Sequence, residues 1–165
     1  MDKFKIGKEL IIAGLPLIRI HGIKSNGACT CYKGQDCESP GKHPVEAGWY
    51  NKIITSVDQL EKNLKEYPDM NIGIPTGKDL VVVDVDPRHG GQESYEKYKH
   101  LFPKTMTVIT GGGGLHLYYK KPEGVAVVSN KVNLLPGIDI RADGGFVVAP
   151  GSKHKSGNYY KWKEN

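Results

Sequence analysis

The chain has 165 residues, 38% hydrophobic and 25% charged, which is typical of one globular domain of about 100–200 residues. No apolar run approaches the roughly 18 residues needed to span a bilayer, which excludes a membrane-spanning chain. No clean cleavage site follows the N-terminal stretch, so we expect no secretory signal and a single cytoplasmic domain over residues 1–165. The net charge is +5, concentrated in residues 111–165 with eight Lys or Arg against four Asp or Glu, and this favours an anionic partner, although a solvated Lys-rich face explains it equally well.

The first third of the chain predicts a strand, a long loop and a helix. We expect the strand over residues 15–20 and the loop over 22–48, which contains all three cysteines. A loop of that length needs its own internal fastening. Ser56, followed three residues later by Gln59, forms a capping-box pattern that predicts a helix over 57–67.

The remaining chain consists of short apolar runs separated by glycine and proline, a pattern that predicts strands and tight turns. The predicted strands are 71–75, 80–86, 105–110, 115–120, 125–129, 137–141, 145–149 and 158–162, with a second helix at 92–102. Glycines 111–114 predict the turn of a hairpin. We therefore expect an α+β fold with a largely antiparallel sheet.

Three aspartates are candidate metal ligands. Asp84 and Asp86 alternate along an apolar strand, so their side chains project from the same face. Such a pair repels itself unless a cation intervenes, and carboxylates favour Mg²⁺ or Mn²⁺, including two-ion sites with the ions about 3.5–4 Å apart. Asp139, with Arg141 two residues later on the same face, supplies a third carboxylate. The alternatives are acids that bond to turn amides and an Asp139–Arg141 pair that shapes a hairpin.

The hairpin after the glycines carries a polar face. Strand alternation places His116, Tyr118 and Lys120 together, beside a glycine turn that lets a ligand approach the backbone closely. This combination suits a triphosphate, although four glycines are otherwise simply a flexible turn. The glycines do not match the Walker pattern, so an ATPase loop is disfavoured. Asp143 precedes two glycines and is predicted to be a turn residue.

The cysteine-containing loop offers a donor set for tetrahedral zinc within fifteen residues. The four candidate ligands are Cys29, Cys31, Cys37 and His43. An odd cysteine count in a reducing compartment argues against a disulfide framework. The alternatives are free thiols with an unrelated His43, or His21 as the fourth ligand. Lys42, beside His43, is expected to face a nucleotide or a strand.

Several segments in this order resemble one known family. They are the DxD of Asp84 and Asp86, the GGxH of Gly113, Gly114 and His116, the GIDIRADGGFVVAPGS segment with Asp139 and Arg141, GKHP at 41–44 and NIGIPTG at 71–77. Together they resemble the N-terminal bifunctional primase–polymerase (prim-pol) domain of the archaeo-eukaryotic primase superfamily. The resemblance runs from about residue 15 to residue 162.

This resemblance implies an RRM-like catalytic core, spanning about 52–162, in a replication protein of a plasmid, phage or other mobile element. It implies that Asp84, Asp86 and Asp139 hold two Mg²⁺ or Mn²⁺ ions. The nucleotide-binding residues it implies are His116, with Gly113 and Gly114 of the same motif, and Arg141. Many relatives carry Ser or Thr where this chain has Gly112, so the hydroxyl contact to phosphate is expected either to be absent or to come from Thr110. A helicase domain is expected to follow in a longer protein.

We expect a template-directed DNA polymerase with DNA primase activity that uses nucleoside triphosphates. The candidate DNA-binding residues are Lys131, Lys153, Lys155, Tyr159 and Lys161, with Tyr160 and Trp162 interleaved for base stacking. These aromatic residues are equally compatible with core or edge packing. Two other functions stay open, namely a metal-dependent nuclease or phosphodiesterase and a non-catalytic, zinc-bearing module that binds nucleic acid.

Overall fold

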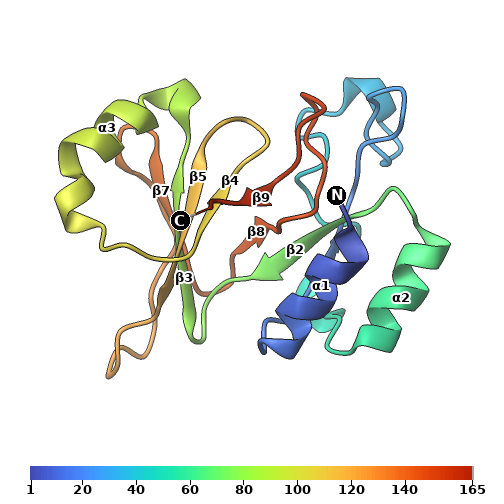
Figure 1. Cartoon of the computed structure of the whole chain (residues 1–165), viewed down its shortest axis with the longest axis horizontal. Helices are drawn as coiled ribbons and strands as arrows, with labels where there is room; N and C mark the ends of the chain where they lie inside the picture. Colours follow the sequence, from blue (N-terminus) through green and yellow to red (C-terminus); the bar gives the residue numbers. More distant parts are fainter. Residues whose placement is uncertain (165) are drawn as a thin grey trace. The chain divides into compact units, whose positions relative to one another are not determined.

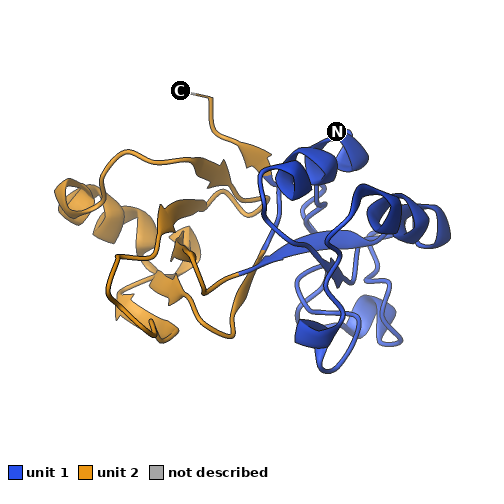
Figure 2. Ribbon diagram, turned by 90° about the horizontal axis from the view of Figure 1, so that it is seen from below, with its two compact units in different colours: residues 1–75, 148–160 blue, residues 76–147, 161–165 orange. Residues whose placement is uncertain are grey.

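The computed structural model describes residues 1–164, which divide into two compact units (Figure 2). Unit 1 comprises Met1–Pro75 and Val148–Tyr160. Unit 2 comprises Thr76–Val147 and the C-terminal segment that begins at Lys161. Among the described residues, no helix combines the length and the apolarity that a membrane crossing requires.

Unit 1 combines two helices with a small sheet. Its elements are α1 (Lys3–Ile12), β1 (Ile18–Ile20), the 3-10 helices η1 (Gly34–Asp36) and η2 (Trp49–Asn51), α2 (Val57–Glu66), β2 (Asn71–Pro75) and the end of β8 (Phe146–Val148). The strands follow the order β1-β2-β8, and β1 runs antiparallel to β2. The sheet and both helices contribute to the buried core, and the predicted loop 22–48 is largely irregular (Figure 1).

Helix α2 confirms the predicted capping box. The Ser56 hydroxyl accepts from the Gln59 N–H, and the Gln59 side chain accepts from the Ser56 N–H. Helix α1 was not predicted, because Gly7 interrupts a weak apolar pattern. A Cβ at Gly7 would lie 2.7 Å from Cδ2 of Leu60, so the glycine permits the close approach of α1 to α2. Tertiary packing therefore stabilises a helix that the local pattern of apolar residues does not predict.

Unit 2 is built around an antiparallel sheet. Its elements are β3 (Leu80–Val85), η3 (Pro87–His89), α3 (Gly91–Tyr98), η4 (Lys99–Leu101), β4 (Thr107–Ile109), β5 (Leu115–Lys120), β6 (Lys131–Leu135), β7 (Ile138–Arg141), the start of β8 and β9 (Lys161–Trp162). The six-stranded sheet has the order β6-β7-β3-β5-β4-β9 (Figure 1). The mixed α/β composition and the antiparallel pairing agree with the prediction.

The two faces of this sheet differ in character. One face contributes Val83, Val85, Leu117 and Ile138 to a buried cluster, against which Tyr95 of α3 and Phe102 pack. Burial of each of these aliphatic side chains stabilises the fold by about 1.5–3 kcal/mol. The opposite face therefore carries the alternate residues, including the polar ones.

Two predicted strands differ from the structure. The segment 125–129 is not a strand, because the Val128 N–H donates to the Asp143 carboxylate at 2.7 Å and its carbonyl accepts from the Asp143 N–H at 3.0 Å. The strand in this region is β6, which begins at Lys131. The predicted strand 158–162 shortens to β9, because the Tyr160 N–H donates to the carbonyl of Ser152 in a local turn of unit 1.

Candidate active site and metal cluster

Asp84 lies at the centre of the polar face of unit 2. Strand β3 lies between β5 and β7, and its register places Asp84 directly opposite His116 on one side and Asp139 on the other. Residues directly opposite in an antiparallel pair project from the same face. Nε2 of His116 is 3.6 Å from Oδ1 of Asp84. Asp84, His116 and Asp139, which are distant in sequence, therefore meet on one face.

Arg141 bridges the two central carboxylates. Its Nη2 lies 2.8 Å from Oδ2 of Asp139 and 3.8 Å from Oδ2 of Asp84. The other oxygen of Asp139 accepts the backbone N–H of Asn133 at 2.8 Å. Asn133 has a positive φ of 52° and lies where the register of β6 shifts, so an irregularity at the sheet edge aims this N–H at the acid. Both oxygens of Asp139 are thus held in place.

Asp86 is engaged differently. It follows the end of β3 and caps η3, and its Oδ1 accepts from the backbone N–H and from Nε of Arg88, each at 3.0 Å. Its Oδ2 lies 2.5 Å from Nη2 of Arg88. These hydrogen bonds from Arg88 lower the pKa of Asp86 to about 2. Asp86 therefore matches the alternative interpretation, in which the acid bonds to a turn amide at the end of a strand. A metal ion bound by Asp86 would have to share its carboxylate with Arg88.

The glycine turn between β4 and β5 is confirmed as a hairpin turn. Gly114 donates its N–H to Oγ1 of Thr110 at 2.9 Å, and the Thr110 N–H donates to the carbonyl of Gly114 at 2.9 Å. A Cβ at Gly114 would lie 2.2 Å from the carbonyl oxygen of Val85, so only glycine allows this approach to the end of β3. Gly113 has a φ of 87° and open space around its Cα, which leaves that side of the turn accessible to a ligand.

Tyr118 lies on the same face of β5 as His116, opposite Val82 in the register. Its side chain is buried, its ring centroid is 5.7 Å from that of Trp162, and its hydroxyl has no hydrogen-bond partner among residues 1–164. Burial and the neighbouring charge of Asp84 raise the pKa of Tyr118 above its ordinary value. His116 is also buried, at 5% exposure. Lys120, at the end of β5, is exposed, so the polar face is open at that end.

The three cysteines and one histidine of the loop form a compact cluster in unit 1. Cys29, Cys31, Cys37 and His43 each offer a ligand atom, and these atoms all lie within 4.8 Å of one another. Nε2 of His43 is 3.6 Å from Sγ of Cys29 and 3.4 Å from Sγ of Cys37. Among residues 1–164 this is the one such group of three or more metal-ligating side chains.

His21 does not join this cluster. Its Nδ1 lies 3.0 Å from Oγ1 of Thr30, and its ring stacks near that of His43 at a centroid distance of 4.6 Å. Three thiols and one imidazole match the tetrahedral donor set of a structural zinc site. Burial raises the pKa of the Cys37 thiol to about 11, so a cation is needed to make its thiolate favourable at neutral pH.

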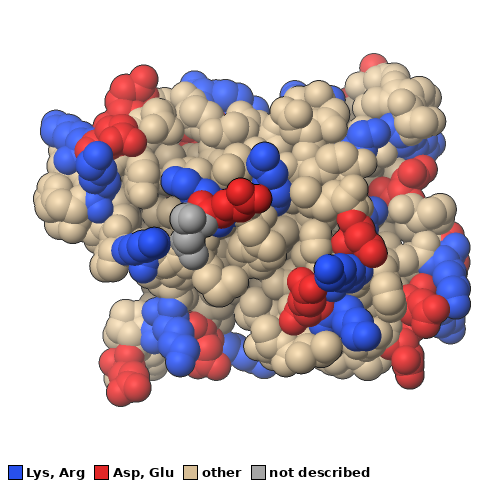
Figure 3. Space-filling model, viewed as in Figure 1, with Lys and Arg blue, Asp and Glu red and all other residues tan. Residues whose placement is uncertain are grey.

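The predicted DNA-binding side chains are divided between the two units. Lys153, Lys155 and Tyr159 belong to unit 1, whereas Lys131 and Lys161 belong to unit 2. On the face shown in Figure 3, acidic and basic side chains are interspersed. Tyr160 is buried at 3% exposure and therefore serves the core. The DNA-binding role of the other residues, and a nucleotide role for Lys42 in the cysteine loop, stay predictions.

Two of the segments that resemble the family also hold distant parts of the chain together by side-chain hydrogen bonds, which was not predicted from the sequence. The buried amide of Asn71 donates to the carbonyls of Gly41 and Lys153, at 3.0 and 2.8 Å, and accepts from the Lys153 N–H. Asp143 accepts the N–H groups of Val128 and Lys78, which lower its pKa. It lies in the turn that the Gly145 N–H closes by donating to the carbonyl of Ala142, which confirms the turn predicted here. The only indication of these hydrogen bonds in the sequence was the presence of Asn and Asp, whose side chains commonly bond to backbone groups.

No curated protein matches the chain. A family model described as bifunctional DNA primase/polymerase, N-terminal (Prim-Pol), matches residues 8–165, which is almost the whole chain. The match includes both the acidic face of unit 2 and the cysteine cluster of unit 1. The chain therefore belongs to the Prim-Pol family, whose members carry out nucleotidyl transfer of the primase/polymerase type.

Proposed function

We propose that this protein is a template-directed DNA polymerase with DNA primase activity, using two divalent ions and (d)NTP substrates. The observation that carries the proposal is the placement of Asp84 between Asp139 and His116 on one sheet face. In phosphoryl transfer of this kind the protein has little covalent chemistry to perform, and it contributes mainly positioning and charge neutralisation. A face with two adjacent carboxylates and one imidazole supplies both.

The donor chemistry of this face fits Mg²⁺ or Mn²⁺. Asp84 and Asp139 offer hard oxygen ligands from adjacent strands, and Asp86 offers a third carboxylate at the end of β3. When bound, two ions would activate the attacking 3′-hydroxyl and neutralise charge on the triphosphate. Arg141 already neutralises the two central acids, at 2.8 and 3.8 Å. Its planar guanidinium is suited to binding a phosphate when a cation takes over that task.

The glycine turn and His116 form the expected triphosphate side of the site. Asp84, 3.6 Å from Nε2 of His116, orients the imidazole. His116 then hydrogen-bonds to a phosphate oxygen. Gly113 allows close approach of the phosphates to the backbone, and the Thr110 hydroxyl already accepts from the Gly114 N–H, so it would donate its own proton to a ligand.

Two structural proposals accompany this function. The antiparallel sheet of unit 2, with α3 on one face and the acids on the other, supports an RRM-like core. A zinc ion bound by the Cys29, Cys31, Cys37 and His43 cluster would stabilise the loop around it. The replication context of a mobile element and the following helicase domain stay predictions from the resemblance. Contacts of Lys131 and Lys161 with DNA stay a prediction from the basic and aromatic side chains of the C-terminal segment.

A primer assay tests the function against its competitors. The protein is incubated with a primed DNA template, dNTPs and Mg²⁺ or Mn²⁺. Polymerase activity lengthens the primer, a nuclease shortens it, and a module that only binds shifts its mobility. Asp84→Asn and Asp139→Asn should each abolish extension, whereas Asp79→Asn, at an exposed turn before β3, should retain it. Extension by Asp139→Asn at the wild-type rate would refute the proposal.

A further inference from the structure

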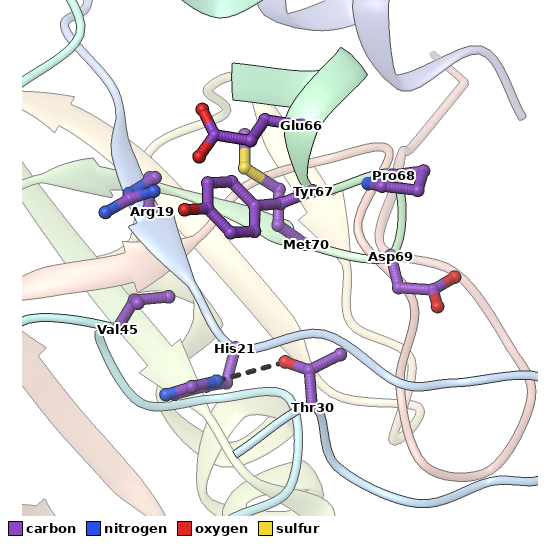
Figure 4. A pocket seen from close by; sticks show the side chains of 9 residues that line it. All are labelled: Arg19, His21, Thr30, Val45, Glu66, Tyr67, Pro68, Asp69 and Met70. Atoms are coloured by element: carbon purple, nitrogen blue, oxygen red, sulfur yellow. Dashed lines mark hydrogen bonds between the residues drawn. The ribbon is translucent and has the colours of Figure 1, made fainter.

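Unit 1 contains a cavity that neither the acidic face nor the cysteine cluster explains. It has a volume of about 310 Å³ and lies between β1, the cysteine-containing loop and the turn that joins α2 to β2 (Figure 4). Small-molecule sites usually span about 300–1,000 Å³. The cavity is therefore large enough for one small ring system and too small for a length of polymer.

Two aromatic rings face this cavity. In Figure 4 the rings of Tyr67 and His21 lie on opposite sides of the open space, and Arg19 lies beside Tyr67. The guanidinium carbon of Arg19 is 4.8 Å from the centroid of the Tyr67 ring. Aromatic rings and guanidinium planes are the surfaces on which proteins stack unpaired nucleobases. The wall therefore favours a flat, aromatic ligand.

The charges around the cavity disfavour a phosphate inside it. Arg19 forms an ion pair with Glu46, so its positive charge is already balanced. Two further carboxylates, those of Glu66 and Asp69, contribute to the lining. An anionic group within the cavity would meet like charges, which cost binding free energy. A neutral planar ring, with its phosphates outside, meets neither obstacle.

The aromatic walls are held in place without a ligand. The His21 ring is fixed on one edge by Thr30, at 3.0 Å, and packs near His43, at a centroid distance of 4.6 Å. Tyr67 follows the last residue of α2, and its ring packs against the guanidinium of Arg19, which is held in turn by its ion pair with Glu46. Walls that are ordered in advance reduce the entropy that a ligand must overcome on binding.

We infer that this cavity binds a single unstacked nucleobase, which enters between Tyr67 and His21 while its phosphate stays outside. The inference is independent of the proposed nucleotidyl transfer, because the cavity lies wholly within unit 1 and the acidic face within unit 2. The base can come from single-stranded DNA or from a free nucleotide. Both sources offer the same ring chemistry, and the experiment separates them.

The test measures binding by the full chain without divalent ions, so that no catalysis takes place. Fluorescence anisotropy compares a labelled single-stranded oligonucleotide with the same oligonucleotide carrying abasic sites. Tyr67→Leu should weaken binding to the intact strand by about 5- to 150-fold, the range for one lost base–aromatic stack. It should leave binding to the abasic strand unchanged. Tyr67→Phe should restore wild-type affinity, and Tyr50→Leu is the matched control, since Tyr50 is 65% exposed and outside the cavity.

A second arm titrates a free nucleoside into the wild type and Tyr67→Leu and follows backbone amide resonances. One outcome is that the His21 and Thr30 resonances shift only in the wild type, while Tyr67→Leu binds the oligonucleotide as the wild type does. That result supports the cavity as a base site and assigns it to a free nucleotide. Equal loss of affinity for intact and abasic strands overturns the inference, because Tyr67 would then act on the strand backbone. Absence of both the base-dependent loss and the nucleoside shifts overturns it as well. Failed primer extension with intact base capture refutes only the proposed function.

Discussion

Removing the charge of Asp139 should separate folding from ion binding. Asp84 and Asp139 are direct register partners, so their Cα atoms are about 4.5–5.5 Å apart. At an effective dielectric constant of about 20, two like charges about 5 Å apart repel by about 3 kcal/mol. A guanidinium and a carboxylate in direct contact have charge centres about 4 Å apart and attract by about 4 kcal/mol. Asp139→Asn removes both the repulsion by Asp84 and the attraction of Arg141. The free energy of unfolding without divalent ions should therefore change by only about 1 kcal/mol.

Divalent ions should then distinguish the wild type from this variant. Free Mn²⁺ at ten times its Kd stabilises the folded state by about 1.4 kcal/mol. For a chain of this size, that raises the Tm by about 3–6 °C. Differential scanning fluorimetry of the zinc-loaded protein, titrated with Mn²⁺, should show this rise in the wild type and in Asp79→Asn. Asp139→Asn should lack it.

Two results would refute this reasoning. If Asp139→Asn and the wild type gain the same Tm at each Mn²⁺ concentration, the ion binds without Asp139. If Asp139→Asn loses several kcal/mol of stability before any ion is added, the balance between the Asp84 repulsion and the Arg141 attraction is wrong. In that case the bridge is mainly a structural ion pair.

The remaining predictions concern His116, the zinc cluster and Tyr118. His116→Ala should raise the KM for dNTP by about tenfold, the loss of one hydrogen bond to a charged group, with little change in DNA affinity; an unchanged KM would remove His116 from the nucleotide site. About one equivalent of zinc should survive dialysis of the wild type and be lost in Cys31→Ala, as measured by atomic emission, whereas an equally stable metal-free wild type would refute a structural ion. Tyr118→Phe should stabilise the fold by about 1 kcal/mol, because it removes a buried hydroxyl that has no partner among residues 1–164. Since the pKa of Tyr118 is raised in the folded state, wild-type stability should fall as the pH rises through the ordinary value of 10.0, and Tyr118→Phe should fall less steeply in pH-dependent urea melts.

Strand alternation was enough to predict which residues share a face within one strand. The apolar run around Asp84 identified a central strand, whereas the meeting of Asp84 with His116 and Asp139 was implied by the resemblance and depends on the register of three strands. The sequence did not predict which partner each acid takes. The pairing of Asp86 with Arg88 depends on the 3-10 helix that follows β3, and the N–H from Asn133 depends on a register shift in β6.

Other features could not be predicted from the sequence because they depend on tertiary contacts. Helix α1 contains Gly7, whose cost in a helix is offset by close packing on Leu60. The segment 125–129 has strand-like composition, but Asp143 binds its backbone and competes with a ladder. His43 was predicted as the fourth ligand of the cluster, with His21 as the alternative, and the fold of the loop brings His43 to the cysteines while His21 lies beside Thr30.

The most direct test of the central claim is the position of bound Mn²⁺ in a crystal of the protein with a non-hydrolysable dNTP analogue. Anomalous scattering locates the ions without assumptions about the ligands. We predict Mn²⁺ bound to carboxylate oxygens of both Asp84 and Asp139, with the triphosphate beside His116 and Arg141. Ions and nucleotide bound elsewhere, with Arg141 still bridging the two carboxylates, would contradict the account.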